Sequence, residues 1–283
     1  MTRTVIIGDV HGRLEPFMAL LKKAGAIDEH GQRIEGVTVI QMGDILDLGY
    51  FNHEADFYTK TRHLIDVQMI GNHEWPAFAP NSGAVQFNGW DDRDRDAEIL
   101  VKRDFREGRF VAAHHVGDWL LVHAGLHPAM QAAAGLTGTA EDIANSLNEL
   151  LLNDPSNTIF NAIGERRGGG AKFGGIFWND ITDLNEAYAN GGEVKQVCGH
   201  SSYGETGEQV EDTLWMIDTK GGCAALVTDD DGKTFELIVE NREPKPRQVR
   251  LSEDEVRDMI RELVEDGELT DTEAQQLLGQ TLG

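Results

Sequence analysis

The sequence predicts an α/β sandwich whose sheets contain both parallel and antiparallel strands. Two observations support this fold class. In the first half of the chain, runs of β-branched and aliphatic residues alternate with segments in which apolar residues recur at helical spacing. From residue 194 onward, strand-like runs follow one another with only short turns between them. Strand–helix alternation followed by strand-rich sequence is typical of such a sandwich.

The first strand and the first helix show the pattern most clearly. RTVIIGD at 3–9 is rich in β-branched residues and ends at a glycine and an acid, and RLEPFMALLKKAG at 13–25 has apolar residues at helical spacing before Gly25. DDDG at 229–232 predicts a hairpin turn. By the same criteria we expect further helices near 54–65, 93–106 and 140–152, and further strands at 37–44, 66–72, 118–125, 194–200, 213–219, 223–229 and 234–240.

A change in composition separates the last part of the chain from the rest. The segment REPKPRQVR at 242–250 is a proline-bearing connector. The residues after it contain two capping boxes, Ser252 with Glu255 and Thr270 with Glu273. We therefore predict a catalytic domain over residues 1–245 and a helical hairpin over residues 250–283. The apolar stripe of this hairpin would pack on its own chain or mediate self-association with a partner subunit.

The chain is strongly acidic, with 25 basic and 49 acidic residues and a formal net charge of −24. Such a surface repels duplex nucleic acid and anionic membranes, because both bind chiefly through Lys and Arg. No apolar run approaches the roughly 18 residues of a membrane span. Two cysteines form no disulfide framework, and the N-terminus enters a strand at once. These features predict a cytoplasmic protein. Because the chain is strongly acidic, we expect metal ions to supply the positive charge of any phosphate site.

Metal-ligand side chains follow five of the predicted strands, in the motifs GDVHG, GDILDLG, GNHE, HAG and CGH. They are Asp9, His11, Asp44, Asn72, His123 and His200. In an α/β sheet, ligand sites gather at the carboxyl ends of strands. Three histidines, two aspartates and one asparagine exceed the needs of one tetrahedral zinc ion. They suit two divalent ions such as Mn, Fe, Zn or Co that share one carboxylate.

These motifs, in this order, resemble the calcineurin-like metallophosphoesterase superfamily over about residues 4–220. They are most similar to its phosphoprotein phosphatase branch, which contains protein Ser/Thr phosphatases and bacterial diadenosine tetraphosphate hydrolases. The resemblance implies a four-layer α/β/β/α sandwich and two divalent metal ions, with manganese favoured. It implies the following ligands: Asp9, His11 and Asp44 for one ion, and Asp44, Asn72, His123 and His200 for the other.

The resemblance also implies a mechanism, in which a metal-activated hydroxide attacks phosphorus in line. The leaving group then needs a proton. In the family the donor is the histidine of GNHE, here His73, and it is oriented by the second aspartate of GDxxD, here Asp47. We therefore expect His73 and Asp47 to be the catalytic residues besides the metal ligands.

Two positions depart from the family pattern. The arginines that usually bind the substrate phosphate are replaced by Leu48 and Ile70, and neither can form a bidentate contact with phosphate. The basic side chains that could take their place lie after GDVHG and in the glycine-rich loop at 164–175. They are Arg13, Arg166, Arg167 and Lys172.

Three functions remain open on the sequence alone. The first is hydrolysis of a phosphomonoester on a small molecule, a nucleotide or a phosphoprotein. The second is hydrolysis of a phosphodiester or phosphoanhydride such as a dinucleoside polyphosphate, for which Trp75, Phe78 and Trp90 could stack on a nucleobase. The third is a catalytically weak metal-binding protein, in which the lost arginines mark lost activity.

Overall fold

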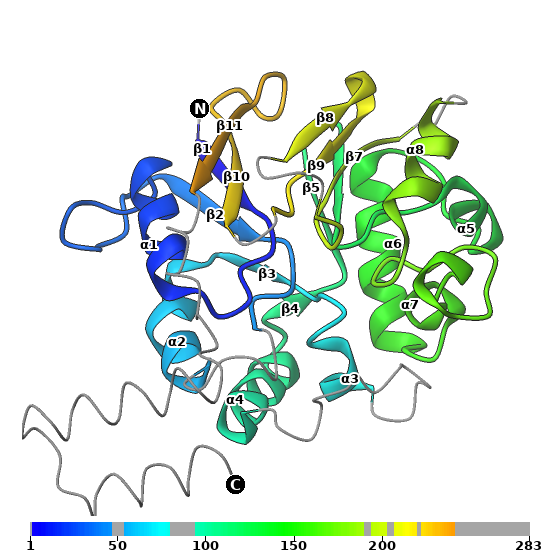
Figure 1. Ribbon diagram of the computed structural model, residues 1–283, viewed down its shortest axis with the longest axis horizontal. Helices are drawn as coiled ribbons and strands as arrows, with labels where there is room; N and C mark the ends of the chain where they lie inside the picture. The colour runs from blue at the N-terminus through cyan, green and yellow to red at the C-terminus, as the bar shows by residue number, and fades with distance from the viewer. Residues whose placement is uncertain are drawn as a thin grey trace, which may run out of the picture. The chain divides into compact units, whose positions relative to one another are not determined.

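The computed structural model describes residues 2–46, 54–79, 94–189, 194–202, 207–219 and 222–240. The predicted hairpin at 250–283 lies outside them. The described part contains two mixed sheets (Figure 1). In spatial order, the first sheet consists of β11 (Glu236–Glu240), β10 (Cys223–Thr228), β1 (Arg3–Ile7), β2 (Val37–Gln41), β3 (Val67–Met69) and β4 (Phe110–Val111). The second consists of β5 (Ala113–Val116), β6 (Trp119–Val122), β7 (Lys195–Cys198), β9 (Leu214–Met216) and β8 (Glu208–Val210).

The pairing brings the carboxyl ends of the central strands to one edge of each sheet. In the first sheet, β1, β2, β3 and β4 pair in parallel, whereas β10 and β11 complete the sheet antiparallel. In the second sheet, β6, β7 and β9 are parallel, whereas β5 and β8 are antiparallel to their neighbours. The loops after β1, β2, β3, β6 and β7 carry the predicted metal ligands, so this topology supplies the edges at which those side chains meet.

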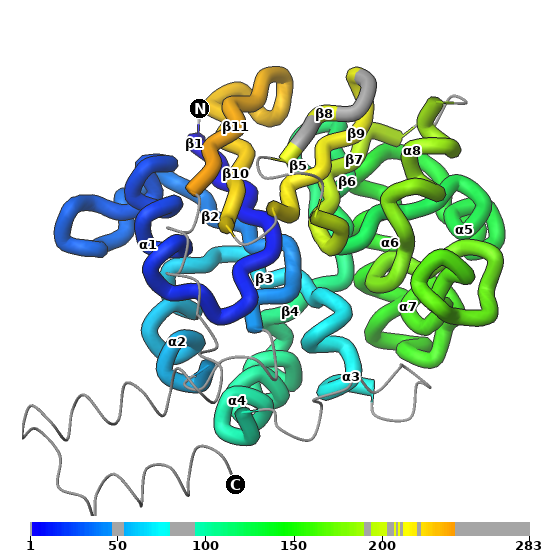
Figure 2. Tube along the Cα trace, viewed as in Figure 1, coloured from blue at the N-terminus to red at the C-terminus, as the bar shows by residue number. Residues whose placement is uncertain are grey.

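Helices cover the outer face of each sheet, which gives a helix–sheet–sheet–helix order of layers (Figures 1 and 2). Beside the first sheet lie α1 (Leu14–Lys23), α2 (Glu54–Thr61) with the 3-10 turn η1 (Arg62–Leu64), and α4 (Arg95–Arg106). Beside the second lie α5 (Pro128–Ala133), α6 (Ala140–Asn153), α7 (Thr158–Asn161) and α8 (Ile181–Ala189). The short elements α3 (Trp75–Phe78), η3 (Glu165–Arg167) and η4 (Glu211–Thr213) lie in connecting segments.

The core explains why β1 reads as a continuous apolar run rather than as an alternating one. Ile6 points into the cluster between the two sheets, together with Leu121 and Val197. Its neighbours Val5 and Ile7 belong to the cluster that includes the buried side chains of α1. Since side chains alternate along a strand, burial of both faces requires apolar residues at successive positions.

The predicted helices agree with the structure to within a few residues. The helix expected at 93–106 is α4, and the side chain of Asp94 caps it by accepting from the N–H groups of Asp96 and Ala97. The five strands that precede the predicted ligands are shorter than expected at their carboxyl ends, because pairing stops where the ligand-bearing loops begin. The sequence reading missed β4, β5 and β8, which have only two to four residues each. Among the described helices, none has the length and apolarity that crossing a membrane requires.

Candidate metal centre

Backbone hydrogen bonds join the strand ends into one site. The carbonyl oxygen of Asp44 accepts from the backbone N–H groups of Val10 and His11, at 3.0 and 2.9 Å. The second sheet joins the first through His200, whose backbone N–H donates to both carboxylate oxygens of Asp9 at 3.1 and 3.0 Å. The carbonyl of His123 accepts from Gly199 at 2.7 Å. The loops after strands that are far apart in sequence therefore share one hydrogen-bond network.

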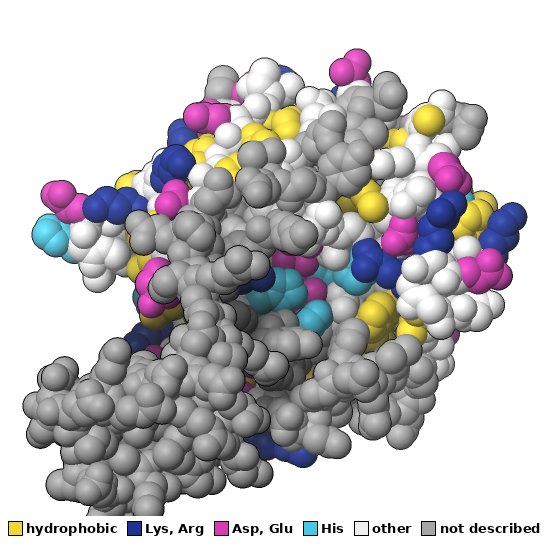
Figure 3. All heavy atoms as spheres, in the orientation of Figure 1, with side chains coloured by type: hydrophobic (Ala, Val, Ile, Leu, Met, Phe, Trp, Pro, Cys, Tyr) yellow, Lys and Arg dark blue, Asp and Glu magenta, His cyan; other side chains and the backbone are white. Residues whose placement is uncertain are grey.

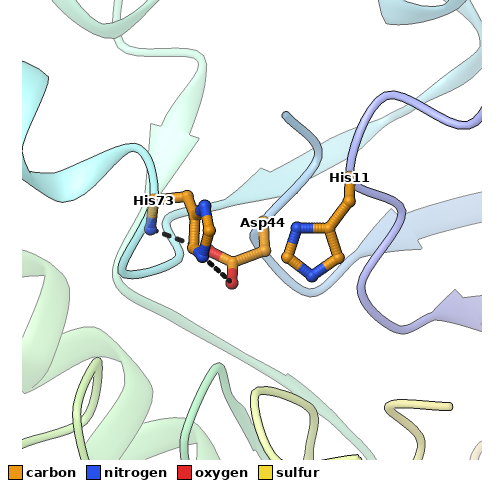
Figure 4. Close-up of side chains that lie close together, drawn as sticks. All are labelled: His11, Asp44 and His73. Carbon is orange, nitrogen blue, oxygen red and sulfur yellow. Dashed lines mark hydrogen bonds and ion pairs between the residues drawn. The ribbon is translucent and has the colours of Figure 1, made fainter. Parts of the chain in front are cut away.

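The Asp44 carboxylate lies at the centre of the site. Two groups of side chains each place three ligand atoms within 4.8 Å of one another, and both groups contain Asp44. One consists of His11, Asp44 and His73, and Figure 4 shows the carboxylate between the two rings. The other consists of Asp44, His123 and His200. This arrangement can hold two cations that share one carboxylate.

The amide of Asn72 completes the second group. Its Oδ1 atom lies 2.9 Å from Nε2 of His123 and 2.6 Å from Nδ1 of His200. The Nδ1 atom of His123 lies 3.0 Å from the carbonyl of Met42, to which it donates in the neutral tautomer. In this tautomer the lone pair on Nε2 faces the oxygens of Asn72 and Asp44, which also carry lone pairs. Such a contact is favourable when a cation lies between the nitrogen and the oxygens. The donor set therefore fits a divalent metal ion.

Asp9 is placed differently from the other predicted ligands. It is buried, and its Oδ2 atom lies 3.8 Å from Nε2 of His11. In the compact group around His11, the third residue is His73 rather than Asp9. All six predicted ligands thus lie in the site. The ring of His73 also lies near Asp44, with Nε2 at 3.8 Å from Oδ2, and this position suits a metal ligand as well as a general acid.

The backbone is strained at the same residues. Four described non-glycine residues have positive φ, and three of them are His11, Asp44 and His200, at 51°, 51° and 66°. This region is unfavourable for side chains with a Cβ atom, and it persists where the surrounding structure compensates the cost. Close packing explains the motif glycines: a Cβ atom on Gly71 would lie 2.1 Å from Oδ1 of Asp44.

The site contains buried carboxylates whose negative charge a bound cation would neutralise. Burial raises the pKa of the Asp9 carboxyl well above its usual value, and nearby Asp218 adds to this shift. Burial alone would lower the pKa of His123, but the Asp44 and Asp9 carboxylates raise it to about 9. Burial opposes ionisation of Asp44 as well, yet His123 and His73 hold the pKa of this carboxyl well below its usual value. A proton on His123 therefore supplies, in the protein alone, positive charge that a metal ion would provide.

Comparison with known proteins identifies the family. The profile of the calcineurin-like phosphoesterases matches residues 2–204. The chain belongs to this family. Its members are metal-dependent phosphoester hydrolases that use divalent ions, so the sequence-based resemblance and the enzyme class are confirmed. No curated protein sequence is significantly similar to the chain.

Solved structures support the fold of this calcineurin-like phosphoesterase. A cold-active protein-tyrosine phosphatase of a psychrophilic Shewanella species is 18% identical, with a TM-score of 0.55, over 84% of this chain and 77% of that one. A second structure of a cold-active protein tyrosine phosphatase has 18% identity and a TM-score of 0.53, over 80% and 73%. A putative diadenosine tetraphosphatase is 16% identical over 86% of this chain and 95% of that one, with a TM-score of 0.45. The four-layer sandwich is thus confirmed. At 18% identity, the similarity to these structures shows the fold alone.

The two adjacent arginines of the glycine-rich loop have different surroundings in the phosphoesterase. Arg166 is half exposed and pairs with Asp183 and Glu186, at 2.6 and 3.0 Å. Arg167 lies closer to the metal centre, because its Nη2 atom donates to the hydroxyl of Ser201, the residue after His200. The Nε atom of Arg167 lies 3.1 Å from Oδ2 of Asp180.

Of the remaining predicted site residues, Arg13 and Lys172 have partners away from the ligand groups, and three others lie outside the described residues. Arg13 donates to the carbonyl of Gly222 at 2.8 Å, and Lys172 lies over the ring of Phe173, 5.1 Å from its centroid. Asp47 and Leu48 lie outside the described residues, as does Trp90.

Figure 3 shows histidine, acidic and basic side chains gathered around a hollow on one face of the molecule.

The prediction that Trp75 could stack on a nucleobase is wrong. Its side chain is fully buried, packs on the rings of Phe160 and Phe177, and donates through Nε1 to Asn161 at 3.0 Å. Phe78 stacks on the ring of Phe105, with 4.2 Å between centroids. These rings serve the core because α3 begins directly after GNHE and turns its apolar side chains inward.

Sequence reasoning missed two buried acids of the site. Asp218 follows β9, is only 5% exposed and accepts from the hydroxyl of Ser202 at 2.9 Å. The sequence contained a signal for Asp218, because this residue closely follows a strand, as the predicted ligands do. Glu74, the last residue of GNHE, is fully buried and accepts hydrogen bonds from three backbone N–H groups. Its motif was recognised, but a pattern of letters does not indicate what a buried carboxylate contacts.

Proposed function

We propose that this phosphoesterase is a phosphomonoesterase with a dinuclear metal centre, in which Asp44 is shared by both ions. Asp9 and His11 would complete one site. Asn72, His123 and His200 would complete the other. The observation that carries this proposal is that the two compact groups of ligand atoms have only Asp44 in common. When bound, two divalent ions, with manganese favoured, lower the pKa of a water and neutralise charge on the phosphoryl oxygens.

The protein's own contribution is to hold these ligands before metal arrives. The carbonyl of Met42 accepts from Nδ1 of His123 and orients the ring, so that Nε2 points toward Asn72 and Asp44 and would become a metal ligand once it loses its proton. The backbone N–H of His73 donates to Oδ1 of Asp44 at 2.9 Å, which leaves Oδ2 directed toward His123 and His73. Such a preorganised arrangement needs little rearrangement when charge develops on the phosphoryl group.

We propose His73 as the general acid that protonates the leaving group. Its side chain is 21% exposed, whereas that of His123 is fully buried, so a substrate can reach the His73 ring from solvent. The edge-on contact with the His11 ring, at 5.0 Å between centroids, holds it beside the metal site. Asp47 remains the proposed orienting carboxylate.

For the substrate we propose a phosphomonoester on a small molecule, a nucleotide or a phosphoprotein. Arg167 is our choice for the residue that binds the phosphate, because it borders His200 and keeps a guanidinium close to the centre. The burial of Trp75 removes one of the rings on which the dinucleotide alternative depended.

A metal-dependent substrate panel tests the proposal. The metal-free protein is reconstituted with Mn²⁺ and assayed with p-nitrophenyl phosphate, bis(p-nitrophenyl) phosphate and diadenosine tetraphosphate, with His123→Ala as the inactive control. We expect turnover of the monoester to exceed turnover of the diester and the dinucleotide. Faster hydrolysis of either of the latter would favour the phosphodiester or phosphoanhydride alternative. Two bound ions without any hydrolysis would favour the catalytically weak metal-binding protein.

A further inference from the structure

The carboxylate of Glu74 is buried directly behind Asp44. Its side chain is inaccessible to solvent. The Oε2 atom accepts from the backbone N–H groups of Asp44 and Gly71, both at 2.9 Å, and Oε1 accepts from Leu46 at 3.2 Å. Buried carboxylates are costly unless they are hydrogen-bonded, and these three donors meet that requirement.

The three donors belong to two different loops. Asp44 and Leu46 follow β2, whereas Gly71 follows β3, so the side chain of Glu74 joins the ends of two neighbouring strands. The link is reciprocal. Glu74 holds the main chain of Asp44, and the side chain of Asp44 accepts from the main chain of His73 at 2.9 Å. Side-chain position at Asp44 is thereby coupled to the geometry of both loops.

Asp44 requires such support because of its backbone conformation. With φ of 51°, it lies in the left-handed region, which aspartate adopts more readily than most residues with a Cβ atom but still at a cost that local hydrogen bonds must offset. The hydrogen bond from its N–H to Glu74 holds the peptide group before its Cα atom, and the carbonyl, which accepts from Val10 and His11, holds the peptide group after it. The direction of the carboxylate follows from this peptide orientation.

We propose that Glu74 is a positioning residue that sets the Asp44 carboxylate for metal binding. The inference rests on the proposed role of Asp44 as the ligand shared by two ions. Glu74 touches neither substrate nor metal in this scheme and acts only through Asp44 and its loop. Residues that orient metal ligands in this way typically affect metal affinity about 10- to 100-fold when they are substituted.

The test compares Glu74→Gln with wild type by calorimetric titration of the folded, metal-free proteins with Mn²⁺. Gln keeps the shape of Glu but turns one acceptor oxygen into an NH₂ group, which faces an N–H. We expect two ions per chain, bound about 10- to 100-fold more weakly, with catalysis partly restored at high Mn²⁺. The matched control is Glu98→Gln on α4, a nearly buried glutamate that pairs with Lys102 at 2.5 Å and should keep wild-type affinity.

The alternatives give different results. Mn²⁺ affinity within about threefold of wild type, combined with a lower melting temperature, would mean that Glu74 is only structural and would overturn the inference. Should Glu74→Gln fail to fold, Glu74→Asp keeps the charge and is titrated in its place. Failure of both variants to fold, even with added Mn²⁺, would assign Glu74 to the fold and would also overturn it. Wild type that binds fewer than two ions would instead refute the proposed dinuclear centre.

Discussion

The Oδ1 atom of Asp44 accepts a hydrogen bond from the backbone N–H of His73 at 2.9 Å. This contact joins the loops after β2 and β3, and it places the proposed shared ligand against the proposed general acid. The ring of His73 returns toward the same carboxylate, with Nε2 at 3.8 Å from Oδ2 (Figure 4). A change at either residue is therefore expected to affect the other.

Asp44→Asn should weaken both metal sites together, because the amide keeps the shape of the carboxylate but not its charge. We expect metal analysis after dialysis to find less than one ion per chain, whereas wild type retains two. Asp104→Asn on α4 is the matched control and should retain both. Two tightly bound ions in Asp44→Asn would contradict the shared-ligand assignment.

His73→Asn should slow hydrolysis of alkyl phosphates by roughly 10²- to 10⁴-fold while metal content is kept. Good leaving groups such as p-nitrophenolate need little protonation and should lose less. Steady-state kinetics with both substrate types measure the difference. An equal loss for both, or loss of a metal ion, would assign His73 to the metal group that contains His11 and Asp44.

The neighbouring arginines provide a matched pair. Arg167→Ala should raise KM for a phosphomonoester by about 10- to 100-fold, the loss expected for a charge-assisted hydrogen bond. Arg166→Ala should have a much smaller effect, because its guanidinium is engaged by Asp183 and Glu186. The result to measure is KM at saturating metal. Equal effects of the two variants would show that the hydrogen bond to Ser201 does not mark the phosphate site.

Gly71→Ala should damage the metal centre through packing alone. The new Cβ atom would lie 2.1 Å from Oδ1 of Asp44, so the carboxylate must move. We expect a loss of stability of about 1–3 kcal/mol and weaker Mn²⁺ binding. Gly170→Ala is the control, since nothing lies within 4 Å of its Cβ position and its φ is not positive. Denaturant unfolding and metal titration of both variants give the comparison.

Stability at low pH should depend on Asp104. Burial acts to raise the pKa of this carboxyl, but hydrogen bonds from Arg103, Arg62 and Tyr58 hold it below its usual value. The unfolded state then binds the proton more tightly, so this contribution is complete above about pH 4 and is lost as pH falls through the lower, folded pKa.

Asp104→Asn should therefore lower the free energy of unfolding by about 1–3 kcal/mol near neutral pH, because Tyr58 and the arginines lose a charged acceptor. Below the folded pKa of Asp104 the difference from wild type should become smaller. Urea unfolding at several pH values measures both effects. A difference that stays constant down to the lowest pH would mean that the ionised carboxyl is not the stabilising species.

The sequence alone predicted the longer strands and helices and named the side chains that the structure brings together around Asp44, although it missed short elements such as β4, β5 and β8 and the helix α8. Continuous apolar runs predicted buried strands, and the acid or histidine at each strand end predicted where ligands gather. Both are local signals: side-chain periodicity follows from backbone geometry, and the start of α4 follows from the cap that Asp94 provides. Even Leu48 and Ile70, where arginine was expected, were visible as departures from a motif.

Only the tertiary structure decided which of two adjacent arginines borders the site and what the buried acids do. Arg166 and Arg167 are equivalent in sequence, but their partners come from α8 and from the loop after β7, which the chain brings close only on folding. The same holds for Glu74, whose role depends on three N–H groups from two loops. Side-chain contacts of this kind depend on loop paths and strand pairing, and no local pattern of residues encodes them.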